Sequence, residues 1–356
     1  MQPDHLIVSR TIDERRGRIA ELMTERQYQA YPELAARYGA QGRERCMEDA
    51  IYHLSYLSEA VASASPGLFA DYVAWAKAML AGRGIPAHDL EANLRFMRES
   101  LMEELPGEHG TIAAGYIDST MAQFPALPDE PPGPMQEESP LAGLASQYLD
   151  ALLRGARHDA SRLVLDAVAQ GTPIRDIYLE VFQRSQHEIG RLWQLNRISV
   201  AQEHYCTAAT QLIMSQLYPQ IFSTERNGQV MVAACIGGDL HEIGVRMISD
   251  FFEMEGWDTF YLGASTPLRS IVQTVIDRGA HLLAISATMT FHVRGVKELI
   301  AAIRTNPACS HVKVLVGGYP FNAAPDLWRQ TGADAYARSA AEAVSVGNTL
   351  MERIPS

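Results

Sequence analysis

The last third of the chain changes its hydrophobic period, and this change restricts the fold more than any other feature. Five short apolar runs follow residue 229, and each precedes a longer stretch with helical spacing; the runs are MVAACI, TFYLG, HLLAISAT, KVLVGG and ADAYA. Strands that alternate with helices require a parallel sheet with helices on both faces. Residues 226–356 are therefore predicted to form a five-stranded, flavodoxin-like (Rossmann-type) α/β domain, whose ligands lie beyond the carboxyl ends of the strands.

Two helical regions precede this domain. Residues 141–225 contain four helical patterns with short connections, which predicts an antiparallel four-helix bundle, and Ser199 is expected to cap its last helix. Residues 1–123 predict an all-α N-terminal domain, and the segment 124–140 holds six prolines, which favour a semi-rigid linker. The chain is thus expected to be multi-domain. The helices expected in the N-terminal domain span 10–38, 47–62, 68–82, 90–105 and 111–124.

Composition excludes several classes of function. The formal charge is −12, and residues 1–138 hold 22 acidic against 12 basic residues. This part would repel nucleic-acid phosphates, so no direct nucleic-acid binding is expected. The four cysteines are widely spaced, which fits a reducing compartment. There is no run of about eighteen apolar residues, so no membrane span is expected and the protein is predicted to be cytoplasmic.

The stretch GGDLHEIG follows the first predicted strand and opens the next helix, so Asp239 and His241 are expected at the edge of the sheet where ligands bind. His241 could bind a metal through one ring nitrogen while Asp239 holds the other N–H. No other metal-binding side chain accompanies this pair in the sequence, and a free metal ion usually needs three or four protein ligands. A lone histidine instead suits a metal that a macrocycle already holds.

Three motifs together resemble the cobalamin-binding domain of methionine synthase and its relatives. They are Asp239-x-His241-x-x-Gly244, Ser286-x-Thr288 and Gly317-Gly318, and each falls at the end of a predicted strand. The resemblance implies that His241 is the axial ligand to cobalt (base-off, His-on) and that Asp239 and Ser286 complete its hydrogen-bond chain. It also implies that the nucleotide tail of the cofactor passes the glycine pair. The cofactor contacts assigned on this basis further include Leu240, Ile243, Gly244, Gly263, Thr288, Gly317 and Gly318.

The bundle adds a second pattern, in which Trp193 precedes Glu203 and His204 by nine intervening residues. This spacing resembles the signature of the cobalamin-dependent photoreceptors of the CarH and LitR type, whose bundle covers the upper face of the corrin. The resemblance implies that Trp193 packs on the adenosyl group of adenosylcobalamin, with Glu203 and His204 in the same cavity. Core packing is the alternative for Trp193. CarH has a histidine after this tryptophan where the chain has Gln194, so the upper cobalt ligand after photolysis stays open.

The order of helical domain, linker, bundle and sheet is similar to that of the photocobilins, the subgroup of these photoreceptors that also binds biliverdin. On that resemblance, a bilin pocket is expected in the N-terminal domain. An aromatic stripe at helical spacing is more often part of a core, and this alternative stays open. The candidate bilin residues are His53, Tyr56, Tyr72, Trp75 and Lys77.

The function expected from these resemblances is light sensing. Cleavage of the cobalt–carbon bond would release the bundle and change the contacts of a homo-oligomer, most simply a dimer, or of an effector protein. The alternative is a corrinoid (methylcobalamin) carrier of a methyltransferase system, which would share the three sheet motifs but need no adenosyl pocket. Adenosylcobalamin mutase chemistry is disfavoured because no barrel domain for the substrate is predicted.

Overall fold

The computed structural model describes residues 3–352, and its internal contacts divide the chain into two compact units. Unit 1 contains the chain up to Asp129 together with two later segments, Met289–Arg294 and Tyr319–Gln330. Unit 2 contains the rest, namely 130–288, 295–318 and the residues from Thr331 onward. Each of the two units has its own core and is described separately below.

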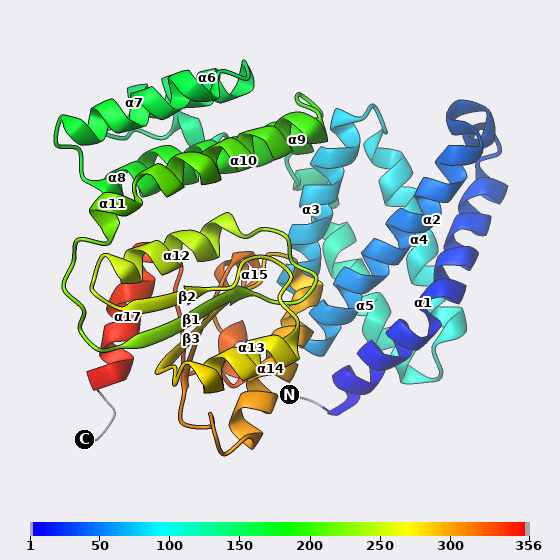
Figure 1. The fold of residues 1–356 in the computed structure, drawn as a ribbon. Coiled ribbons are helices and arrows are strands. Elements are labelled where there is room, and N and C mark those ends of the chain that lie inside the picture. The colour runs from blue at the N-terminus through cyan, green and yellow to red at the C-terminus, as the bar shows by residue number, and fades with distance from the viewer. Residues whose placement is uncertain (1–2, 353–356) are drawn as a thin grey trace. The chain divides into compact units, whose positions relative to one another are not determined.

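Unit 1 is helical, as the sequence predicts (Figure 1). The expected helical stretch 10–38 is helical except for one break: α1 ends at Ala30, and Pro32 precedes the next helix because proline has no N–H to continue the first one. Gly39 then kinks that second helix with a φ of 65°. The helices are α1 (Pro3–Ala30), α2 (Glu33–Ala62), α3 (Pro66–Gly82), α4 (Ala87–Glu104) and α5 (Glu108–Gln123); the short helices η4 (Thr290–His292), α15 (Tyr319–Ala323) and most of α16 (Leu327–Thr331) come from the later segments.

The first half of unit 2 is the predicted bundle. Its last helix, α10 (Val200–Gln216), begins as expected at Ser199, whose hydroxyl accepts from the Gln202 N–H in a reciprocal capping box. The third helical pattern is not uniform, because it contains a π-helical segment between two α-helical ones. The remaining bundle elements are α6 (Ala142–Leu153), α7 (Arg157–Ala169), α8 (Ile174–Asp176), η3 (Ile177–Gln183), α9 (Arg184–Gln194) and α11 (Tyr218–Ile221).

The second half of unit 2 is a five-stranded parallel sheet in the order β2-β1-β3-β4-β5. This order is that of the flavodoxin-like fold, so the predicted fold class is confirmed. Helices cover both faces of the sheet (Figure 1). The strands are β1 (Val230–Cys235), β2 (Asp258–Tyr261), β3 (Leu282–Ser286), β4 (Lys313–Gly317) and β5 (Ala335–Tyr336), and the helices are α12 (Ile243–Glu253), α13 (Leu268–Asp277), α14 (Val293–Thr305) and α17 (Ala340–Glu352).

The bundle and one face of the sheet share a single hydrophobic core. Bundle residues such as Phe182 and Ile213 are fully buried in one cluster with strand residues such as Met231 and Leu282 and with Phe251 of α12. Such continuous apolar burial fixes the bundle over α12 (Figure 1). The bundle therefore lies on the part of the sheet from which the loop carrying Asp239 and His241 emerges.

The proline-rich segment between the predicted domains contains only two short 3-10 turns, η1 (Phe124–Ala126) and η2 (Pro134–Gln136). Arg184 fixes its second half to the bundle, because the guanidinium donates to the carbonyls of Pro134 and Glu137 at 2.9 and 2.6 Å. None of the helices within residues 3–352 combines the length and the apolarity that crossing a membrane would need.

Candidate functional site

The candidate site lies where the strand order of the sheet reverses. β1 has β2 on one side and β3 on the other, so the loops that follow β1 and β3 leave the sheet next to each other. The Ile236 N–H donates to the Ser286 carbonyl at 3.1 Å, which keeps the two strand ends paired. In doubly wound sheets the loops at this reversal form the ligand-binding crevice.

Asp239 joins these two loops. Its side chain is buried, and Oδ1 accepts from both the backbone N–H and Nδ1 of His241, at 3.0 and 2.9 Å. Its other oxygen, Oδ2, accepts from the backbone N–H of Thr288 after β3. The loops that carry the first two sequence motifs therefore meet at Asp239, which a main-chain group of Thr288 reaches from β3. Ser286 lies buried at the end of β3, and its part in the hydrogen-bond chain stays a prediction.

His241 is held by one ring nitrogen and presents the other. Its side chain is 61% exposed, although its neighbour Asp239 is fully buried. The hydrogen bond with Asp239 raises the pKa of His241, burial opposes the rise, and the charges of Asp239 and Glu203 add to it. When Nδ1–H donates to the carboxylate, Nε2 keeps its lone pair and can bind a metal. Leu240 between them is 73% exposed, so this loop turns an apolar and a coordinating side chain outward.

Glycines shape the surroundings of the site. Gly318 has a φ of 105°, and a Cβ there would lie 2.0 Å from the Ala287 carbonyl oxygen, so only glycine lets the main chains after β3 and β4 approach this closely. Gly263 also has a positive φ, with Glu242 3.1 Å from its Cβ position, and Gly317 precedes Gly318 at the end of β4. At Gly244, by contrast, a Cβ would meet nothing within 4 Å, which leaves open space beside the first turn of α12.

This donor set fits a metal complex rather than a free ion. Within residues 3–352 no group of three or more His, Cys, Asp or Glu side chains could hold a metal ion. A single exposed imidazole with its second nitrogen fixed by a carboxylate can supply one axial bond to a metal whose other ligands come from a macrocycle. The open space at Gly244, next to Ile243, suits the approach of such a large group to the backbone.

The bundle residues expected above the corrin lie around the turn between α9 and α10. Glu203 is half-buried and close enough to His241 to affect its pKa. His204 is mostly exposed and pairs through Nδ1 with Glu203 at 2.5 Å. Trp193 is half-buried in the last turn of α9, and Gln194 beside it is buried. The structure thus brings Glu203 and the His241 loop together, while the roles of Trp193 and His204 stay predictions.

Three charged residues that were not predicted from the sequence connect the bundle to the sheet domain: Glu242 directly before α12, and Arg246 and Asp250 on it. Glu242 accepts from Gln211 of α10 at 2.9 Å and from Tyr261 at 2.8 Å. Arg246 donates to Ser215 at 2.6 Å, and buried Asp250 accepts from Tyr178 at 2.7 Å. Burial raises the pKa of Asp250 to about 6. The signal in the sequence was their spacing of four, which places them on one face of a helix.

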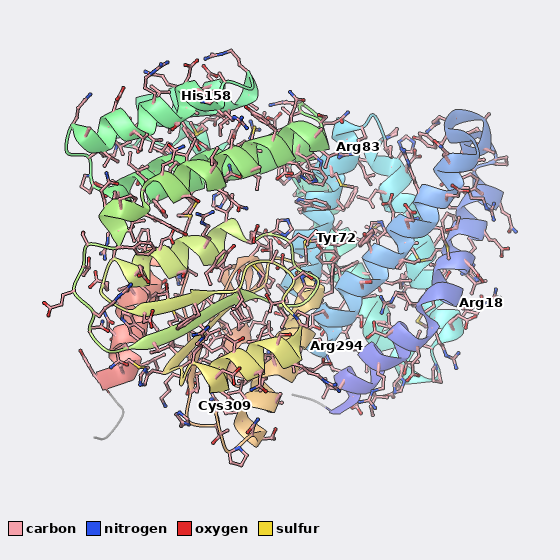
Figure 2. The ribbon with its side chains drawn as sticks, in the orientation of Figure 1. Arg18, Tyr72, Arg83, His158, Arg294 and Cys309 are labelled. Atoms are coloured by element: carbon pink, nitrogen blue, oxygen red, sulfur yellow. The ribbon has the colours of Figure 1, made fainter. Side chains whose placement is uncertain are left out.

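The candidate bilin residues pack together inside unit 1. The Tyr56 and Tyr72 rings stack with centroids 3.6 Å apart and Trp75 stacks beyond Tyr72, which is labelled in Figure 2. The His53 Nδ1 lies 2.8 Å from the Tyr72 hydroxyl, and burial lowers the pKa of His53 to about 4. Lys77 donates to the Leu127 carbonyl at 2.6 Å and pairs with Asp129. This packing favours the core interpretation of these residues and gives the biliverdin assignment no support.

Comparisons with known proteins agree with the corrinoid part of the prediction. Residues 229–345 match a family model described as a B12 binding domain, and residues 144–218 match a second model with the same description. The chain is 25% identical over 213 residues to dimethylamine corrinoid protein 3 of Methanosarcina acetivorans, which covers 59% of this chain and 98% of that protein. It is 32% identical over 146 residues to dimethylamine corrinoid protein 2 of Methanosarcina mazei, covering 41% and 66%.

A solved structure extends the similarity to three dimensions. The monomethylamine corrinoid protein of Methanosarcina barkeri superimposes with a TM-score of 0.53 at 25% identity, covering 59% of this chain and all of that one. Both family matches lie between residues 144 and 345. This part of the chain is a module that binds a cobalt corrinoid, and residues 1–143 lie outside both matches.

These findings correct the interpretation as a light sensor. The relatives above are methylamine corrinoid proteins, so the resemblance to CarH and LitR photoreceptors and to photocobilins was wrong. The spacing of Trp193, Glu203 and His204 did not separate the two classes, because any bundle that covers a corrin needs apolar and polar groups at the same helix ends. The expectations of a light-dependent dimer and of a bilin chromophore lose their basis with it.

Proposed function

We propose that the protein is a corrinoid carrier of a methyltransferase system, which receives a methyl group from one partner enzyme and delivers it to another. The observation that carries this proposal is the extent of the similarity. The module spans 98% of a dimethylamine corrinoid protein and the whole of a monomethylamine corrinoid protein. Its site adds one exposed histidine, His241, held in place by a buried carboxylate.

In this function the chain binds and orients its cofactor. The bound cobalt corrinoid supplies a centre that accepts and releases a methyl group. His241 would hold it through Nε2, and Asp239 keeps the proton at Nδ1 and fixes the ring plane. The Thr288 N–H donates to the other oxygen of Asp239 and holds that carboxylate in place.

The bundle would cover the methyl side of the corrin. Glu203, in the first turn of α10, lies close enough to His241 to affect its pKa, and Trp193 lies in the last turn of the preceding helix. In this proposal a partner enzyme must displace or pass these residues to reach the methyl group. Because the similar proteins are corrinoid proteins named for methylamines, we assign methylcobalamin to the working state. In this proposal the methyl donor and acceptor are activated on methyltransferase partners, as the similarity to methylamine corrinoid proteins suggests.

The proposal is tested by methyl loading. The protein is reconstituted with hydroxocobalamin in the dark, reduced chemically and treated with a carbon-13 methyl donor; NMR then detects a methyl–cobalt resonance that stays with the protein on gel filtration. His241→Ala and the exposed-surface variant Arg162→Met serve as the matched pair. The carrier function would be overturned if the protein failed to take up or retain the methyl group. The same holds if it bound adenosylcobalamin in preference and green light altered its assembly.

A further inference from the structure

Unit 1 includes two segments from the second half of the chain, and each begins directly after a cofactor motif. Met289–Arg294 starts one residue after Thr288, and Tyr319–Gln330 starts one residue after Gly318. Residues 1–129, which lie outside both family matches, therefore pack against the continuations of two cofactor-binding loops.

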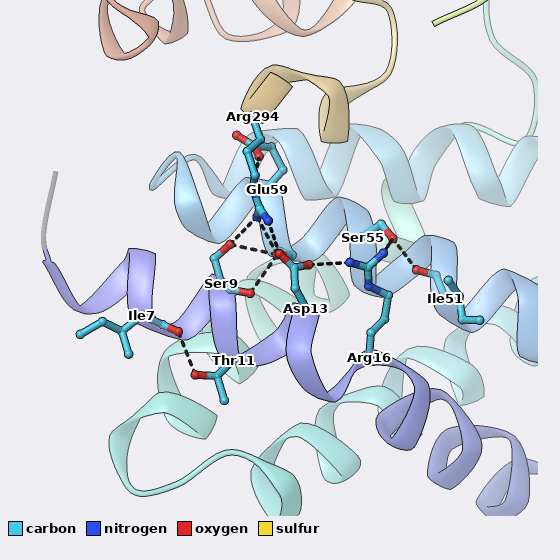
Figure 3. A network of polar contacts seen from close by, with 10 residues as sticks. Ile7, Ser9, Thr11, Asp13, Arg16, Ile51, Ser55, Glu59 and Arg294 are labelled. Atoms are coloured by element: carbon cyan, nitrogen blue, oxygen red, sulfur yellow. Dashed lines mark hydrogen bonds and ion pairs between the residues drawn. The ribbon is translucent and has the colours of Figure 1, made fainter. Parts of the chain in front are cut away.

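Arg294 anchors the first segment. Its guanidinium pairs with Asp13 of α1 and donates to the Ser9 hydroxyl at 3.0 Å, while Nε lies 3.9 Å from Glu59 of α2 (Figure 3). Glu59 is only 2% exposed, so this carboxylate depends on nearby charge for compensation. Arg16 joins the network by donating to Asp13 at 2.9 Å.

Aromatic and polar contacts complete the two attachments. The Tyr56 ring meets Phe291 edge-on with centroids 5.3 Å apart, and its hydroxyl lies 3.6 Å from the Met289 sulfur. In the second segment the Tyr319 hydroxyl donates to Asp71 of α3 at 2.7 Å. Gln330 donates to the Ser63 carbonyl at 3.0 Å.

We propose that Arg294 and Tyr319 are positioning residues through which the N-terminal helices hold the two cofactor loops in their binding conformation. Holding Met289–Arg294 fixes the peptide before it, whose Thr288 N–H donates to Asp239, and Asp239 in turn fixes the ring of His241. Holding Tyr319 fixes the chain directly after Gly318, whose main chain lies against the Ala287 carbonyl at the end of β3. The helices thereby slow release of the corrinoid and favour coordination by His241.

The ion pairs that Arg294 makes with Asp13 and Glu59 are accessible to ions from the solvent. A cavity of about 580 Å³ is lined by residues of the network, including Asp13, Arg16, Glu59 and Arg294, and the Arg294 side chain is 44% exposed. Salt screens pairs of this kind. The attachment by Arg294 is therefore expected to weaken as ionic strength rises, whereas the Tyr56 and Phe291 contact does not.

The inference rests on corrinoid binding and not on methyl transfer, so the two can fail separately. The test uses the full chain loaded with hydroxocobalamin and measures the rate constant of cofactor release into excess apo-scavenger, together with the absorption bands that distinguish histidine-bound from histidine-free cobalt. Arg294→Met is expected to speed release about tenfold and to lower the histidine-bound fraction, because a charge-assisted bond to buried groups is lost. Arg294→Lys should recover part of both, and Arg162→Met on α7 is the control.

Two further measurements keep the inference falsifiable if Arg294→Met folds poorly. Tyr319→Phe removes one hydroxyl from a half-exposed side chain and is expected to speed release about threefold with unchanged thermal unfolding. Raising the salt concentration should speed release from the unaltered protein and leave Arg294→Met unaffected. Equal release rates and equal absorption spectra in all variants, with no salt dependence, would overturn the positioning role.

Discussion

Two histidines, His241 and His53, were both assigned to cofactors from the sequence, and the structure separates them. His241 lies in the loop after β1, its ring is 61% exposed, and a carboxylate holds its Nδ1. His53 lies in α2, only 3% exposed, with its Nδ1 against the Tyr72 hydroxyl. The pKa of His241 is raised by its bond to Asp239, and the pKa of His53 is lowered to about 4 by burial. A histidine ring with one hydrogen-bonded nitrogen can bind a metal or cofactor only when its second nitrogen is accessible.

The comparison predicts the largest effect for His241→Ala. Without the axial imidazole, affinity for hydroxocobalamin is expected to fall by at least about 100-fold. This loss is larger than the one expected when only a residue that orients a metal ligand is removed. Isothermal titration of the reconstituted protein measures this, with His53→Gln as the matched histidine control. Equal affinities for the two variants would remove the distinction between the two histidines.

Asp239→Asn should have the next largest effect. An amide keeps the size of the side chain but removes the charge that holds the His241 N–H and the Thr288 N–H. The affinity is expected to fall about 10- to 100-fold, as for other residues that orient a metal ligand. An affinity within twofold of the unaltered protein would show that the carboxylate is dispensable.

Trp193→Ala tests whether the bundle covers the cofactor. If the indole packs on the upper face of the corrin, its loss should weaken binding about 2- to 10-fold. The same titration measures this effect. Trp257→Phe is unsuitable as a control, because Trp257 is fully buried in the sheet domain. Phe222→Ala, which removes an exposed aromatic ring outside the two attached segments, is the better comparison. Unchanged binding combined with lower thermal stability would assign Trp193 to the bundle core.

His53→Gln should leave cofactor binding unchanged and alter only the pH dependence of folding. Because the folded pKa of about 4 is below the ordinary 6.5, the unfolded chain binds more protons between these values. Above pH 6.5 the ring is neutral in both states and does not change the free energy of unfolding with pH. As the pH falls from 6.5 toward 4, the free energy of unfolding decreases by on the order of 3 kcal/mol, because the unfolded chain binds a proton that the buried ring does not.

Urea unfolding at several pH values measures this contribution as the difference between the unaltered protein and His53→Gln. The difference cancels the opposite trend of Asp250, whose raised pKa makes stability fall as pH rises toward 6. Parallel stability curves for the two proteins would show that His53 is not the buried neutral histidine described here.

The sheet and its motifs were predictable because strand and helix periods differ and because Asp239, His241 and the glycines recur at strand ends. The contact from Thr288 was not predictable, since it comes from a backbone N–H that any residue would provide. The attachment of Arg294 to α1 and α2 was also not predictable, because it joins residues 236 to 285 positions apart without a local pattern.

The wrong assignments have a common physical cause. Helical spacing of His53, Tyr56, Tyr72 and Trp75 reports that one face of each helix is apolar, and a core and a pigment pocket need the same pattern. The Trp193 spacing likewise predicts a covered corrin without indicating what lies on the cobalt. Only the distant relatives, and the mutual stacking of Tyr56 and Tyr72, distinguish these cases.

The central claim is that His241 replaces the cofactor's own base below cobalt, and electron paramagnetic resonance of the cobalt(II) form tests it most directly. The protein is prepared with nitrogen-14 and with nitrogen-15 histidine and loaded with the same unlabelled cobalamin. We predict that the triplet splitting from the axial nitrogen becomes a doublet on labelling, because the nitrogen belongs to His241. A triplet that persists in the labelled protein would show that the cofactor keeps its own base and would contradict the account.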